Sequence, residues 1–126
     1  MTLIFFLVAL FTAAAGLTFG QSIDLSGTWV GETEVPDEVE PDVMTLVLKK
    51  EAGDYTGTIT DSMGMLNEAA CEDIKFVDNK LTFNVEVDTG SEYLQVYLSF
   101  TVEGDTMTGF WEAEDGSMAE VTIKRK

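Results

Sequence analysis

The chain has 126 residues, of which 23 are acidic, seven are basic and none is histidine, so its formal net charge at pH 7 is −16. A charge of this size and sign repels nucleic acids and anionic membrane surfaces, and we expect neither as a partner. The lack of histidine removes the usual general base, the usual transition-metal ligand and any nucleophile that a histidine would activate. We therefore expect no enzyme, no catalytic residue, no cofactor and no metal site.

The first twenty residues have the features of a secretory signal peptide. They carry no charged side chain, and the apolar run 3–11 is followed by small residues that permit a cut after Gly20 or, as second choice, after Ala15. A membrane anchor is the alternative, but the apolar run is shorter than the roughly 20 residues of a spanning helix. The sequence thus predicts a signal peptide over 1–20, one domain over 21–126, and a secreted or periplasmic protein without membrane contact after cleavage.

Beyond Gly20, apolar and polar residues alternate in short segments separated by turns, which is typical of strands with one buried face. Two prolines break the chain after the first segment, and Asp78-Asn79 and Asp115-Gly116 are hairpin turns. The expected strands cover residues 28–35, 43–50, 55–61, 70–77, 81–87, 93–102, 106–114 and 118–124. They predict an all-β fold, an eight-stranded antiparallel up-and-down β-barrel, with a two-sheet sandwich as the alternative.

The only cysteine, Cys71, excludes an internal disulfide. We expect it to be buried, because a free cysteine behaves as a small hydrophobic residue.

The first and last strands of such a barrel pair antiparallel, so the end of one lies beside the start of the other. Arg125 has the same parity as the inward residues Val121 and Ile123 and should point to the axis beside Trp29. A guanidinium over an indole ring is favourable by roughly 0.5–2 kcal/mol. Trp29 and Arg125 are therefore predicted to form the structural floor of the barrel.

Three features of the sequence resemble the calycin superfamily of lipocalins, fatty-acid-binding proteins and avidins: Gly27-x-Trp29 opening the first strand, the eight meandering strands, and the basic residue closing the last one. Thr108-Gly109 also resembles the Thr-Gly strand motifs of avidins. The resemblance implies a barrel with one plugged end and one open mouth that often holds a small apolar ligand. The chain departs from the family in having no lipocalin Thr-Asp-Tyr run, no disulfide and no C-terminal helix.

If Trp29 marks the floor, four loops surround the mouth at the other end, and these loops are rich in acids. An acidic rim over an apolar interior would suit an amphiphilic ligand with a cationic end, or a cationic protein partner. The alternative is that exposed loops of an acidic chain are acidic in any case. The rim acids are Asp37, Glu38, Glu40, Asp42, Asp61, Glu68, Asp88, Glu92, Glu114 and Asp115.

The inward residues nearest the mouth are the predicted binding site for a small apolar or amphiphilic ligand: Met44, Leu46, Ile59, Val85, Leu94, Val96 and Trp111. The same residues could simply fill the barrel, since eight strands leave room either for side chains or for one small ligand. In that case the protein is a structural or interaction module. It would present its acidic loops, or the outer face of Tyr93, Tyr97 and Phe110, to a protein partner.

Overall fold

The computed structural model describes residues 23–35 and 37–126, and the signal peptide expected over residues 1–20 lies outside them. The described residues contain no helix that is long and apolar enough to cross a membrane. The all-β prediction is confirmed. The strands are β2 (Gly27–Thr33), β3 (Asp42–Glu51), β4 (Asp54–Asp61), β5 (Ala69–Ala70), β6 (Glu72–Val77), β7 (Lys80–Asp88), β8 (Tyr93–Glu103), β9 (Thr106–Ala113) and β10 (Met118–Arg125).

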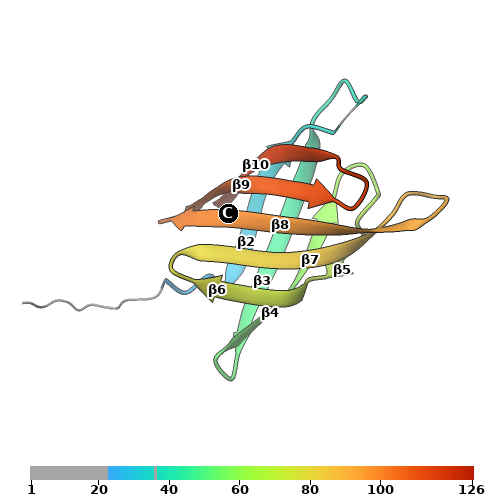
Figure 1. The fold of residues 1–126 in the computed structure, drawn as a ribbon. Coiled ribbons are helices and arrows are strands. Elements are labelled where there is room, and N and C mark those ends of the chain that lie inside the picture. Colours follow the sequence, from blue (N-terminus) through green and yellow to red (C-terminus); the bar gives the residue numbers. More distant parts are fainter. Residues whose placement is uncertain (1–22, 36) are drawn as a thin grey trace, which may run out of the picture.

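These strands form one antiparallel sheet in the order β5-β4-β3-β2-β10-β9-β8-β7-β6. The sheet curls on itself until it is nearly closed, and Figure 1 shows β2, β3 and β4 passing behind β7 to β10 at a steep angle. Except at the β2–β10 pair, strands that are hydrogen-bonded neighbours are also neighbours in sequence. The result is the predicted meander rather than the two-sheet sandwich.

The strand count differs from the prediction, because the segment expected to be one strand over 70–77 forms two. β5 pairs with β4 at one edge of the sheet, and β6 pairs with β7 at the other. Between them, the backbone N–H of Cys71 donates to the carbonyl of Gly57 at 2.9 Å, and Asp73 takes a φ of 56° beside a register shift. A bulge of this kind bends a strand. The bend lets this segment pass from one sheet edge to the other and bridge the barrel.

Cys71 lies half-buried at this bridge and packs against the core. Burial raises the pKa of its thiol to about 12, because the thiolate loses its hydration. Since the thiolate is the reactive species, we expect Cys71 in the folded protein to react with iodoacetamide near pH 8 at least about tenfold more slowly than in urea. Equal rates in the two conditions, measured by mass spectrometry, would contradict this placement.

The hairpin turns form where the sequence predicts them. Asp78 and Asn79 both have positive φ, 54° and 65°, as a two-residue hairpin turn of the type I′ class requires. On β9, a β-carbon added at Gly109 would overlap the carbonyl oxygen of Ser99 on β8. Only glycine permits this close approach, which helps the short sheet to coil.

The first strand ends at Thr33 rather than at residue 35.

The core is one continuous cluster inside the barrel. On β7 burial alternates strictly, with Leu81, Phe83, Val85 and Val87 inside and their neighbours partly or fully exposed, and on β8 it alternates from Val96 to Val102. Phe83 and Phe100 pack with ring centroids 6.3 Å apart. This alternation confirms the inward faces that the period-two pattern predicts.

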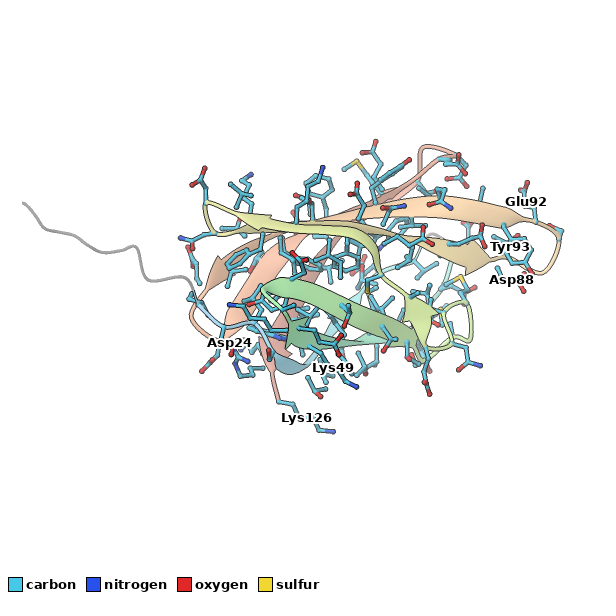
Figure 2. All side chains as sticks on the ribbon, turned by 90° about the horizontal axis from the view of Figure 1, so that it is seen from below. Asp24, Lys49, Asp88, Glu92, Tyr93 and Lys126 are labelled. Atoms are coloured by element: carbon cyan, nitrogen blue, oxygen red, sulfur yellow. The ribbon has the colours of Figure 1, made fainter. Side chains whose placement is uncertain are left out.

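One pole of the barrel is closed by the expected contact between the first and last strands. β10 pairs with β2 so that Arg125 lies opposite Trp29, and the guanidinium carbon is 4.3 Å from the indole centroid. Arg125 also donates to the carbonyls of Asp24 and Ser26, at 3.0 and 2.7 Å, and to the Asp105 carboxylate at 2.9 Å. Figure 2 shows Asp24 at this end of the molecule and Asp88, Glu92 and Tyr93 at the opposite end.

Candidate ligand-binding cavity

A cavity of about 240 Å³ opens at the end of the barrel opposite Trp29. Its wall comes from the ends of β2, β3, β4, β7, β8 and β9 and from all four loops predicted to surround the mouth. The lining residues are Thr33, Val35, Asp42, Met44, Asp61, Met65, Leu66, Val85, Val87, Thr89, Leu94, Val96, Leu98, Trp111, Ala113, Asp115 and Ser117.

Most of the residues predicted to bind a ligand belong to this wall. Met44, Val85, Leu94, Val96 and Trp111 line the cavity, and Met65 and Leu66 from the loop after β4 add to it.

Two of the predicted ligand-binding residues, Leu46 and Ile59, are buried but lie outside the lining. Leu46 pairs with Trp29 across β2 and β3, and Ile59 pairs with Leu46 across β3 and β4. Both therefore share a cross-strand row with Trp29 and fill the closed half of the barrel. Met44 is the next inward residue after Leu46 in the direction of the open end, toward the N-terminus of β3, and it lines the cavity.

Trp111 forms a fixed part of the wall. Its indole N–H donates to the Thr33 hydroxyl at 2.9 Å, and that hydroxyl donates to the carbonyl of Glu120 at 2.7 Å. The chain of hydrogen bonds ties β9 to β2 and β10 and leaves the apolar part of the indole to face the cavity. A positioned aromatic ring of this kind is a common contact surface for small ligands.

Two acids expected on the exposed rim are instead buried. Asp42 is 3% exposed and Asp61 is 6% exposed, and both line the cavity. The correction has a simple cause: Asp42 has the inward parity of Met44, and Asp61 has the inward parity of Ile59. Asp61 lies within the expected strand 55–61 and Asp42 lies one residue before the expected strand 43–50, so parity alone places both side chains on the inward face. Their burial also depends on the loop 62–66, which follows β4.

The Asp42 carboxylate is held by the segment that follows β4. Its Oδ1 accepts hydrogen bonds from the Ser62 N–H at 3.0 Å, from the Ser62 hydroxyl at 3.2 Å and from the Met63 N–H at 3.2 Å. Burial, together with the neighbouring Asp61 carboxyl, nevertheless raises the pKa of Asp42 to about 6. Asp42 therefore titrates close to neutral pH.

Asp61 has one engaged oxygen and one free oxygen. Its Oδ1 accepts the N–H of Leu66 at 2.8 Å, whereas Oδ2 is buried without any hydrogen-bond partner. Burying a carboxylate oxygen with no donor is unfavourable, so such groups mark places where a partner is expected.

The chain matches no protein-family model, no curated protein and no solved structure. The resemblance to calycins remains a prediction from the sequence features that suggested it.

The charges around the cavity are of one sign. Apart from Asp42 and Asp61, the predicted rim acids are exposed, and Asp115 among them also lines the cavity. No lysine or arginine is part of the lining. Within residues 23–35 and 37–126, no group of three or more acids or cysteines is arranged to hold a metal ion. The cavity therefore offers an apolar wall with a few oxygen acceptors and hydroxyls.

Proposed function

We propose that the protein is an exported, calycin-like barrel that binds one small apolar or amphiphilic molecule in the cavity at its open end. The observation that carries the proposal is the cavity itself, whose wall is mainly aliphatic and aromatic with a few polar groups. That composition is typical of small-molecule sites.

The cavity volume limits the size of the ligand. A dry cavity of roughly 150 Å³ in another protein takes benzene, and typical ligand pockets begin near 300 Å³. With about 240 Å³, this barrel has room for one ring with a short side chain. We infer a ligand of that size rather than a long acyl chain.

Titration with phenethyl alcohol and with its amine counterpart, phenethylamine, tests this function. At least one of them is expected to bind saturably at one site and to change the fluorescence of Trp111, which lines the cavity. Trp111→Ala should weaken binding about tenfold or more by calorimetry, because it removes the indole surface and the Thr33 anchor.

Phe110→Ala is the matched control, since it removes the adjacent aromatic ring from the outer face of the same strand. Its affinity for either probe should equal that of the wild type. If neither probe binds the wild-type protein, the proposed function is wrong. Mass spectrometry of natively purified protein adds an independent test, in which a co-purifying small organic molecule is expected.

The outer face supports a second candidate function, docking of a protein partner on the outside of the barrel. Tyr93, Tyr97 and Phe110 are 66%, 55% and 39% exposed on β8 and β9, and exposed aromatic side chains are enriched at protein interfaces. The titrations also separate the two functions: absence of binding by both probes would leave the outer face as the better-supported candidate.

A further inference from the structure

The two buried acids in the cavity wall indicate which chemical class of ligand the cavity binds. This inference rests on the proposed function. The observation is the Asp61 carboxyl: 94% of the residue's surface is buried, its Oδ2 is without a donor, and it lies beside a second buried carboxyl, that of Asp42. Two adjacent buried carboxylates repel each other, and their desolvation is unfavourable unless a positive group or a proton compensates it.

The side chains that the structure describes provide no such positive group. All seven basic side chains lie in the described part of the chain, and none of them lines the cavity. The only arginine, Arg125, is committed to the opposite pole, where it contacts Trp29 and Asp105. The compensating charge must come from a proton or from the ligand.

We propose that the ligand is a small organic amine: an apolar ring or branched chain ending in a primary or secondary ammonium, which donates to the carboxylates of Asp61 and Asp42. Its apolar body would pack against Trp111, Val85 and Val96. An ammonium supplies both the hydrogen-bond donors and the positive charge that this end of the cavity lacks. A carboxylate ligand would face Asp42, Asp61 and Asp115 with no cation to receive it.

Below about pH 6, a proton on Asp42 takes the place of the ammonium in the empty protein. Asp42 holds its proton up to about pH 6 because of burial and the nearby Asp61 carboxyl, whereas Asp115 is exposed and its pKa is lowered by the Ser117 N–H. These three acids are the only charged groups in the lining. An amine at the buried pair should therefore bind more weakly as the pH falls through 6, whereas an amine on exposed carboxylates would weaken only near pH 4.

Three probes of matched shape test the proposal: phenethylamine, phenethyl alcohol and hydrocinnamate, each titrated by calorimetry near pH 7. The amine is expected to bind about tenfold or more tightly than the alcohol, equivalent to about 1.4 kcal/mol, and hydrocinnamate should not bind. Equal affinities of amine and alcohol would overturn the amine assignment while leaving the proposed function in place. Absence of binding by both would instead refute the proposed function.

Asp61→Asn is the decisive variant. Asparagine keeps the oxygen that accepts the Leu66 N–H but carries no negative charge, so the preference for the amine over the alcohol should fall below about threefold. Asp42→Asn provides a second variant with the same expectation if Asp61→Asn does not fold. Glu92→Gln, which removes one negative charge from an exposed loop at the same end, should keep the full preference.

Two further outcomes would count against the proposal. Retention of the amine preference in both aspartate variants would place the amine on the exposed rim. Displacement of phenethylamine by calcium chloride at matched ionic strength would make the acid pair an inorganic cation site.

Discussion

Replacing Trp29 by alanine is expected to lower the free energy of unfolding by about 3–5 kcal/mol, the range for deleting a large buried aromatic side chain. Trp29 has no exposed surface. Its indole N–H donates to the carbonyl of Leu25 at 3.0 Å, and the Arg125 guanidinium covers its ring. The substitution removes the packing of the closed pole, one buried hydrogen bond and the cation–π contact together. Because domains of this size are stable by only about 5–15 kcal/mol, the variant should be close to unfolding.

Urea unfolding followed by far-UV circular dichroism measures this effect without depending on the tryptophan removed. Trp111→Ala is the matched control, because it deletes the other tryptophan from the half-buried wall of the cavity. Trp111→Ala should lower the free energy of unfolding clearly less than Trp29→Ala does. Arg125→Lys keeps the positive charge but loses the planar group that reaches Asp24, Ser26 and Asp105, so it should be destabilised as well. A Trp29→Ala protein as stable as Trp111→Ala would refute the role of the closed pole.

Stability is expected to fall as the pH rises from about 4 to 7, because of Asp42. Its pKa is near 6 in the folded protein against an ordinary value of 3.8, so the folded state binds more protons than the unfolded state between these values. Where the folded state binds more protons, the free energy of unfolding decreases with rising pH. The contribution of Asp42 is thus complete below about pH 4 and lost above about pH 6, with a size on the order of 2 kcal/mol.

The comparison with Asp42→Asn isolates this contribution from the general relief of negative charge on acidification. Asparagine retains an acceptor for the Ser62 and Met63 donors but cannot ionise. Relative to the wild type, the variant should therefore gain about 2 kcal/mol between pH 4 and pH 7. Asp24 and Asp115 do not disturb this window, because hydrogen bonds lower their pKa values and both are exposed. A stability difference that stays constant with pH would show that Asp42 is not a buried titrating group.

The two predictions concern opposite ends of one barrel, which differ in how their polar groups are satisfied. At the closed pole, Arg125 has protein acceptors for its guanidinium and an aromatic ring beneath it. At the open end, Asp61 lines the cavity and has a buried oxygen with no hydrogen-bond partner. The closed pole therefore has its polar groups satisfied, whereas the open end keeps a buried acceptor without a donor.

The sequence by itself determined most of the strands, their inward faces and the meeting of Trp29 with Arg125. Period-two alternation decides which side of a strand is buried, and the antiparallel meander then decides which strand ends are neighbours. These are local rules, so they can be read from residues such as Leu81, Phe83 and Arg125 without coordinates.

Only the tertiary structure decided the division of one expected strand at Cys71, the burial of Asp42 and Asp61, and the limits of the cavity. The strand divides because that segment has to leave β4 and join β7 for the barrel to approach closure. The two acids have inward parity, but their burial depends on the loop 62–66, which covers them and supplies the donors. Leu46 and Met44 have the same parity on the same strand, yet only Met44 lines the cavity. Side chains from the neighbouring strands, Trp29 among them, fill the barrel around Leu46, whereas they leave space around Met44.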